Sequence, residues 1–222
     1  MNNKKIGALL LAIASTTSYA GSMGPAITPE RLLLLEGGFS YSYSFFQDSA
    51  VFPESVTPVT PNGFAINPNN FFPNSYYGGY IGASIYVPSN WLLNTRYDMY
   101  GKESKHNTFA ETIMSFAPAR LSFSVDKLWG DINSFSFGAG AGVVLETLND
   151  GDSLIAINVQ NPLSESLQGR SRLDPLVEAF GMYRFANNFG IKVNAGYQIP
   201  VYNKFSDGDL NVNVGINYSF AI

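Results

Sequence analysis

The sequence predicts an all-β protein, an antiparallel up-and-down transmembrane β-barrel of eight strands with short periplasmic turns and longer extracellular loops. Three observations support this prediction. Bulky apolar residues alternate with small polar residues in many segments, the N-terminus resembles an export signal, and only 14% of the residues are charged. The alternation is clearest at 38–45, which reads Gly-Phe-Ser-Tyr-Ser-Tyr-Ser-Phe. Because successive side chains of a strand point to opposite faces, this segment has one aromatic face and one small polar face.

Residues 1–20 are expected to form a cleaved signal peptide. Lys4 and Lys5 give a positive start, Ile6–Ala14 is a short apolar stretch, and Ser18-Tyr19-Ala20 fits the small-x-small cleavage pattern. An uncleaved membrane anchor is the alternative, but a spanning helix needs about 20 apolar residues. We therefore expect the mature protein to begin at Gly21.

The composition of the mature chain excludes several classes of function. Without the signal peptide, 11 basic and 17 acidic residues give a charge of −6, which disfavours nucleic-acid binding. The chain has no cysteine, so disulfides and thiolate metal sites are excluded. Soluble domains have about 25% charged residues, and their scarcity here indicates an exterior that is not covered by water. We expect a periplasmic segment at 21–32 and one barrel domain at 33–222.

Eight segments have the period-two pattern of barrel strands. They are Leu33–Phe46, Ser75–Val87, Trp91–Gly101, Phe109–Val125, Ser134–Thr147, Leu173–Phe185, Gly190–Val201 and Leu210–Phe220. In the fourth segment the alternation changes phase at Pro118, so that Phe116 would face outward only if the strand is bulged there. A bulge is expected because proline cannot donate to the ladder.

The connections between these segments alternate between short and long. Ser89-Asn90, Asp126–Asn133 and Ala186–Phe189 are short, whereas Gln47–Asn74, Lys102–Thr108, Asp150–Arg172 and Asn203–Asp209 are generally longer. Outer-membrane barrels place short turns in the periplasm, and an even strand count leaves both termini there. Trp91 and Trp129 flank the short connections and are predicted to be anchors at the membrane interface, with an ordinary core position as the alternative.

Alternation alone does not decide which face points inward. In a soluble lipocalin-like barrel the apolar face would line a cavity. Here the polar face consists mostly of Gly, Ser and Asn, which suits the crowded lumen of an eight-stranded barrel. The other face has too many large aromatic residues for that interior, so we expect it to face hydrocarbon.

The last strand gives the sharpest resemblance to a known family. With its sequence Gly215-Ile216-Asn217-Tyr218-Ser219-Phe220, the chain resembles the small outer-membrane β-barrels of Gram-negative bacteria, the class of the OmpA membrane domain, opacity-type proteins and OmpW-like proteins. The resemblance implies an integral monomer in the outer membrane, in contact with lipid and lipopolysaccharide. It also implies that Gly215, Tyr218 and Phe220 belong to an assembly signal read by the barrel-assembly machinery, although Ala221-Ile222 follow the terminal aromatic.

Charged residues of both signs are predicted on the lumen side. They are Glu36, Arg96, Asp98, Arg120, Glu146, Glu178, Arg184 and Lys192. Buried charges must pair or they cost several kcal/mol each, so we expect a salt-bridged network that fills the barrel. A polar path for a small solute or ion is the alternative, although eight strands usually leave no open pore.

Other residues that could carry chemistry are few. His106 is the only histidine, and no serine or acidic motif accompanies it in the sequence, so an exposed loop residue is expected. Asp150-Gly151-Asp152-Ser153 lacks the later acidic positions of a calcium loop and reads as a solvated turn. No catalytic residue, cofactor or metal is predicted.

The first long loop contains five prolines and the aromatic residues Phe52, Phe64, Phe71 and Phe72. These rings either fold over the barrel mouth, recognise an external partner, or contact lipopolysaccharide. The sequence therefore predicts a structural or surface-interaction role through the extracellular loops. The alternative is an OmpW-like narrow channel for small solutes, which would need a lateral opening in the wall near Pro118.

Overall fold

The computed structural model describes residues 31–48, 50–52, 64–70, 72–87, 89–107, 112–150, 171–185, 188–201 and 206–221. These residues form eleven strands and one short 3-10 helix, η2 (Pro68–Asn70). The strands are β1 (Leu32–Phe46), β2 (Ala50–Phe52), β3 (Phe64–Ile66), β4 (Ser75–Val87), β5 (Trp91–Tyr100), β6 (Glu103–Asn107), β7 (Thr112–Gly130), β8 (Phe135–Asp150), β9 (Ser171–Arg184), β10 (Phe189–Gln198) and β11 (Ser206–Ala221). The signal peptide predicted at 1–20 lies outside the described residues.

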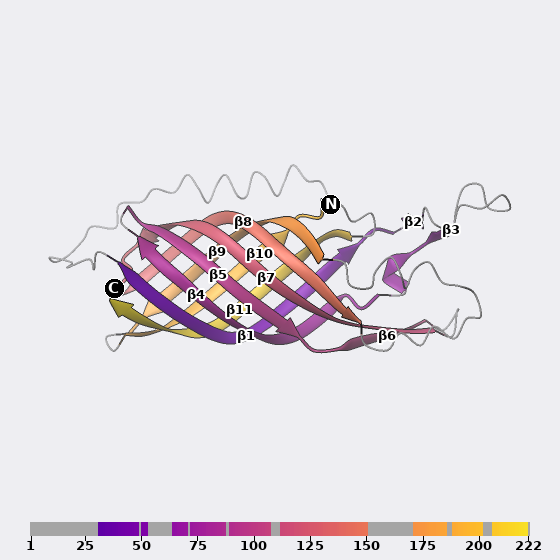
Figure 1. Ribbon diagram of the computed structural model, residues 1–222, viewed down its shortest axis with the longest axis horizontal. Coiled ribbons are helices and arrows are strands. Elements are labelled where there is room, and N and C mark those ends of the chain that lie inside the picture. Colours follow the sequence, from indigo (N-terminus) through magenta and orange to yellow (C-terminus); the bar gives the residue numbers. More distant parts are fainter. Residues whose placement is uncertain are drawn as a thin grey trace.

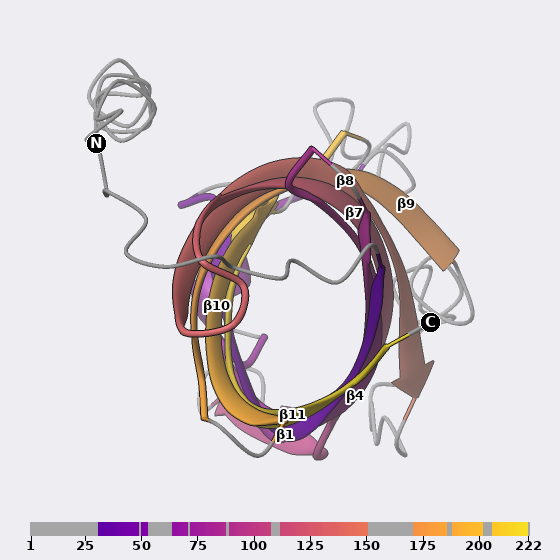
Figure 2. The same ribbon diagram turned by 90° about the vertical axis from the view of Figure 1, so that its left-hand side faces the viewer.

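Eight of these strands close into a barrel, which confirms the predicted fold. Each neighbouring pair is antiparallel, in the order β5-β4-β1-β11-β10-β9-β8-β7, and a ladder between β5 and β7 closes the ring. Figure 2 shows the closed ring in a view along the barrel. The first and last strands are joined by a long ladder from Leu32 opposite Ala221 to Phe46 opposite Ser206. Every barrel strand thus has two neighbours, and no edge is left open to hydrocarbon.

The two ends of the barrel differ. At the short-turn end lie the described ends of β1 and β11 and the connections β4–β5, β7–β8 and β9–β10. Ser89 and Asn90 have positive φ angles of 73° and 62°, which fits a tight two-residue hairpin turn. At the opposite, long-loop end lie the β2–β3 hairpin, η2 and β6, as Figure 1 shows. No helix in the described part of the chain is long and apolar enough to cross a membrane.

The expected bulge at Pro118 is not where the sequence placed it. β7 is one continuous strand, and it pairs with β8 without a register shift from Phe116 opposite Asp150 to Gly130 opposite Ser136. The irregularity lies in the neighbouring strand. Met99 is opposite Ala119 but Glu103 is opposite Phe116, so four steps along β5 and β6 match three along β7. Phe116 therefore keeps the parity of Arg120, and it is buried instead of facing outward.

The faces of the barrel are distributed as the alternation predicts. Large apolar side chains of all eight barrel strands are exposed on the outside, and Ile81 and Ile216 are 61% and 63% exposed. Inward positions of the same strands hold buried polar residues, such as Ser40 and Asn213, both fully buried. Such an exterior is stable in hydrocarbon, whereas in water it would be an apolar patch far larger than soluble proteins tolerate.

Candidate functional site

The lumen is the first part of the molecule where polar chemistry is concentrated. All eight charged residues predicted for the lumen, Glu36, Arg96, Asp98, Arg120, Glu146, Glu178, Arg184 and Lys192, are at most 8% exposed. They come from six different strands. Five salt bridges join three of the cations to five carboxylates, one of which is Asp209. The interior is therefore a salt-bridged polar network, and its contacts fall into three layers along the barrel axis.

The layer nearest the long-loop end is centred on Arg120. Its guanidinium contacts Glu146 at 2.6 Å and Asp209 at 3.5 Å. It also donates to the hydroxyl of Ser42 at 2.5 Å and to the side-chain oxygen of Asn211, and it lies 5.3 Å from the centre of the Tyr100 ring. A fully buried guanidinium is acceptable only with such complete pairing, because its desolvation costs several kcal/mol.

The central layer joins β5 to β9 across the lumen. Arg96 contacts Asp98 at 3.1 Å on its own strand and Glu178 at 3.2 Å on β9. Asp98 also accepts hydrogen bonds from Ser40 at 2.8 Å and from Asn213 at 2.6 Å. Apart from the Arg96–Asp98 pair, these contacts bridge residues 58 to 115 positions apart in the chain, so they fix distant strands relative to one another.

The layer nearest the short-turn end contains Lys192. Its ammonium contacts Glu36 at 3.1 Å and the side-chain oxygen of Asn94 at 3.5 Å. Asn94 in turn donates to Asp126 at 2.6 Å. Arg184 is set apart from this layer, since it donates to Asn133 at 3.1 Å in the β7–β8 connection and also to Asn188.

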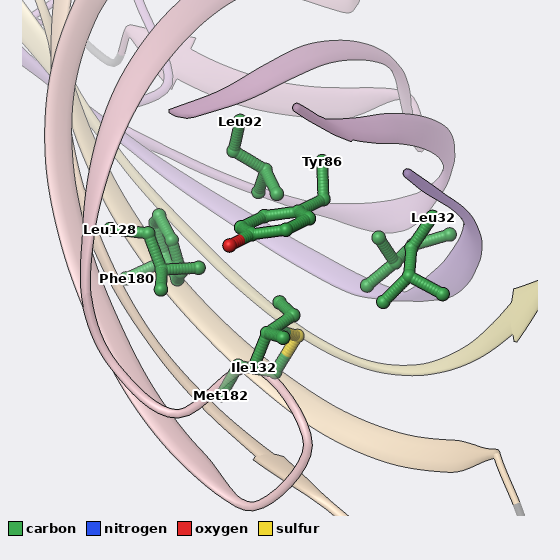
Figure 3. Close-up of a cluster of buried hydrophobic side chains, with 8 residues drawn as sticks. Leu32, Tyr86, Leu92, Leu128, Ile132, Phe180 and Met182 are labelled. Carbon is green, nitrogen blue, oxygen red and sulfur yellow. The ribbon is translucent and has the colours of Figure 1, made fainter. Parts of the chain in front are cut away.

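An apolar cluster lies between the polar network and the short-turn end. Its members are Leu32, Leu34, Tyr86, Leu92, Leu128, Ile132, Phe180 and Met182, each at most 4% exposed. Figure 3 shows side chains from the ends of several strands meeting inside the curve of the barrel wall. Ile132 belongs to the β7–β8 connection, so this turn contributes a side chain to the lumen. We call this cluster the inner apolar layer.

A second apolar cluster lies at the long-loop end. Phe72, Tyr76, Tyr100 and Phe116 are buried together, with Phe46 packed against them. The rings of Phe72 and Phe116 are 5.4 Å apart. We call this cluster the outer apolar layer. The polar network thus lies between two apolar layers.

Several lumen residues were missed by the sequence analysis. Asp126, Asp174 and Asp209 are buried, and so are Tyr76, Tyr80 and Tyr86. Asp126 was assigned to a turn because the pattern ended at residue 125, whereas β7 continues to Gly130. Extending the alternation of Ser122 and Ser124 by one step would have placed Asp126 inward. For Asp174 and Asp209 the same parity argument applies from Glu178 and Asn211.

The four phenylalanines predicted as loop contacts do not share one environment at the long-loop end. Phe72 is buried in the outer apolar layer, so it folds over the barrel mouth and is not an exposed anchor. Phe52 and Phe64 are opposite each other in the β2–β3 ladder, and Phe71 lies outside the described residues. His106 is exposed in β6, not in a loop, opposite Ile113. Of Asp150–Ser153, only Asp150 is described, and it ends β8.

The two tryptophans lie near the short-turn end, on the outer wall. Trp91 begins β5 and is 41% exposed, and its ring lies 5.0 Å from the ammonium of Lys127. Trp129 stacks on Phe137 with ring centres 5.8 Å apart. These positions suit interface anchors, which stays a prediction. In the described part of the chain, no group of three or more His, Cys, Asp or Glu residues could hold a metal ion.

In β11, the closing strand, packing explains why one residue of the predicted assembly signal is a glycine. A Cβ at Gly215 would lie 2.4 Å from the hydroxyl oxygen of Tyr80 and from the backbone oxygen of Gly37, so only glycine fits there. Tyr218 and Phe220 face outward, with their rings 4.7 Å apart. Their recognition by the assembly machinery remains a prediction.

The fold, the apolar exterior and the polar interior together define an integral β-barrel of the bacterial outer membrane, in the small eight-stranded class. The short-turn end is accordingly the periplasmic end, and the long-loop end is extracellular.

Comparison with solved structures finds proteins of the same architecture. The outer membrane protein OprG from Pseudomonas aeruginosa matches with a TM-score of 0.57 and 10% identity, over 86% of this chain and 96% of OprG. The outer membrane protein AlkL matches with a TM-score of 0.52 and 12% identity, over 92% of this chain and 97% of AlkL. At these identities the likeness establishes the fold alone. No protein-family model and no curated protein sequence matches the chain.

Proposed function

We propose that this protein is a closed outer-membrane barrel that displays its extracellular loops, with a structural or surface-interaction role and no catalytic activity. The observation that carries the proposal is the layered lumen. A network of buried, paired charges lies between an inner and an outer apolar layer. A water-filled pathway would have to displace both layers, and an eight-stranded barrel has an interior just wide enough for its side chains.

The extracellular end supports the second half of the proposal. β6 continues past the end of β5, and its partner region of β7 extends with it, so this part of the wall projects from the barrel, as Figure 1 shows. The segment between β1 and β4 adds the β2–β3 hairpin. Lys105 of β6 donates to the backbone oxygen of Asn69 at 2.5 Å, which ties the two projections together. A shaped surface of this kind is suited to recognition.

Conductance in planar lipid bilayers tests the closed lumen. Purified barrel, shown to be folded by its altered gel mobility before boiling, should give no stable open channels under conditions in which a sixteen-stranded porin conducts. Reproducible single-channel steps in the folded protein would refute the closed barrel.

A loop deletion tests the role of the extracellular surface. Replacing residues 50–66 with a short Gly-Ser linker removes the β2–β3 hairpin but retains η2 and Phe72, which belong to the barrel mouth. Cells displaying this variant should lose adhesion to surfaces that the parent protein binds. The control replaces residues 152–168 in the same way. Unchanged adhesion with an intact, heat-modifiable barrel would count against recognition by the hairpin, and loss in both variants would make the effect unspecific.

A second candidate function is a narrow channel for small solutes that opens sideways into the membrane. The observation that favours it is the mismatch of β5 and β6 against β7, opposite Pro118, where the ladder is interrupted. Uptake of a small apolar probe into vesicles containing the folded barrel tests this function. Uptake above that of protein-free vesicles would support it. Uptake equal to the blank would leave the closed barrel as the sole proposal.

A further inference from the structure

Lys127 lies on the outer wall of the barrel near the periplasmic end. Lys127 belongs to β7 and has the outward parity of Val125, whereas its neighbour Asp126 points into the lumen and is fully buried. The two side chains therefore lie on opposite sides of the wall and do not pair. Lys127 is opposite Trp91 on the neighbouring strand β5 and opposite Ala139 on the other neighbour, β8.

The contacts of Lys127 place its charge at the periplasmic rim. Its ammonium lies 5.0 Å from the centre of the Trp91 ring and donates to the backbone oxygen of Ser89, in the β4–β5 turn, at 2.5 Å. An ammonium has three donors. Within the described part of the chain, the Ser89 oxygen is the one hydrogen-bond acceptor that Lys127 has. Trp129, two residues further along the same outward face, stacks on Phe137.

Lys127 forms no salt bridge with any carboxylate in the described part of the chain, which leaves room for an anion from outside the protein. The carboxylate of the adjacent β7–β8 connection, Asp131, instead accepts from the backbone of Asn133 at 2.9 Å and from Ser134 at 3.4 Å. The indole rings of Trp91 and Trp129 favour the headgroup zone of a bilayer, which is where phosphate groups lie. A lysine in that zone attracts an anionic lipid surface.

We propose that Lys127, together with Trp91 and Trp129, forms a binding site for the phosphate of an anionic phospholipid in the periplasmic leaflet. The ammonium binds the phosphate, and the two indoles fix the depth of the lipid headgroup against the wall. On β8, Ala139 is directly opposite Lys127, and its side chain ends at Cβ.

The chain carries its own reporters for this site, because Trp91 and Trp129 are its only two tryptophans. The barrel is refolded into vesicles that contain brominated phosphatidylglycerol or brominated phosphatidylcholine, and the quenching of tryptophan fluorescence gives the relative affinity of the two lipids. One lysine near the surface should favour the anionic lipid by about fivefold. Lys127→Gln should lose this preference, and Lys127→Arg should keep it.

Lys102→Gln is the matched control, because Lys102 lies at the extracellular end. It should leave the preference unchanged. Inorganic phosphate at millimolar concentration should not abolish it, which separates a lipid headgroup from a free anion. The proposal is overturned if phosphatidylglycerol is not preferred, if Lys127→Gln retains the preference, or if inorganic phosphate removes it. The altered gel mobility of each unboiled variant establishes that the compared barrels are folded.

Discussion

The pairing in the lumen predicts that removing one central cation destabilises the barrel strongly. Arg96 is 5% exposed and contacts two buried carboxylates, Asp98 at 3.1 Å and Glu178 at 3.2 Å. In Arg96→Gln, the neutral amide keeps part of the volume and some hydrogen bonding but no charge. Loss of one partner of a buried ion pair costs about 3–5 kcal/mol, because the remaining charge stays buried. Since the amide replaces some contacts, we expect a loss of about 3 kcal/mol.

The assay is reversible urea unfolding of the barrel in lipid vesicles, followed by tryptophan fluorescence. Arg96→Gln should lower the free energy of unfolding by that amount, and the double variant Arg96→Gln with Glu178→Gln should lose less than the sum of the two single variants, because it leaves one carboxylate fewer without a partner. Thr95→Val, the outward neighbour on β5, is the control and should change little. A loss below about 1 kcal/mol for Arg96→Gln, or full additivity, would refute a charge-paired lumen.

Two further substitutions test the exterior and the crowding of the lumen. Val214→Arg puts a charge on the lipid face, where Val214 is 44% exposed. If that face lies at the bilayer midplane, the substitution should lower the free energy of unfolding by about 2–4 kcal/mol in the same urea assay. An unchanged unfolding midpoint would mean that the position of Val214 is not in hydrocarbon. Gly140→Val would place a Cβ 2.2 Å from both Asp126 Oδ1 and the backbone oxygen of Val125, so no heat-modifiable band should form, whereas Ala141→Val on the outer face should fold. A folded Gly140→Val barrel would contradict this packing.

The strands were the most predictable feature, for a physical reason. In a spanning strand, the side chain of each residue faces either hydrocarbon or the lumen. The sequence therefore alternates with period two, and the direction of each side chain follows from its position in the alternation. The predicted segment Ser75–Val87 coincides with β4, and the boundary of β1 differs by one residue. The same parity identified Arg96 and Lys192 as inward residues before their partners were known.

The apolar layers were not predictable by the same reasoning. Tyr86, Leu92 and Phe180 are inward residues of ordinary hydrophobicity, and near the strand ends both faces of the wall are apolar. The alternation of apolar and polar residues, which distinguishes the two faces elsewhere, is therefore absent near the strand ends. What decides their place is contact with strands far away in the chain, as for Tyr86 on β4 and Phe180 on β9. A single sequence does not contain that information.

The error at Pro118 has a similar origin. A proline removes one ladder donor, so the sequence predicts a shift in the strand that contains it. The structure places the extra residue in the neighbour, between Met99 and Glu103, so β7 stays regular. A missing backbone donor also affects the neighbouring strand, which loses the hydrogen bond that it would have accepted. The register shift can therefore occur in that neighbouring strand and not in the strand that contains the proline. The consequence is functional as well as geometric, since Phe116 then points inward and completes the outer apolar layer.

The order of layers along the lumen connects stability to function. A charge network inside a membrane is costly unless its members pair, and its pairs become stronger when water is excluded. The inner and outer apolar layers limit the access of water to the Arg96 and Arg120 clusters from either end. In the closed barrel that we propose, the arrangement that excludes solutes also makes the barrel body rigid. The proposed role in recognition then belongs to the surfaces outside this filled interior, which are the extracellular projections and the lipid-facing rim.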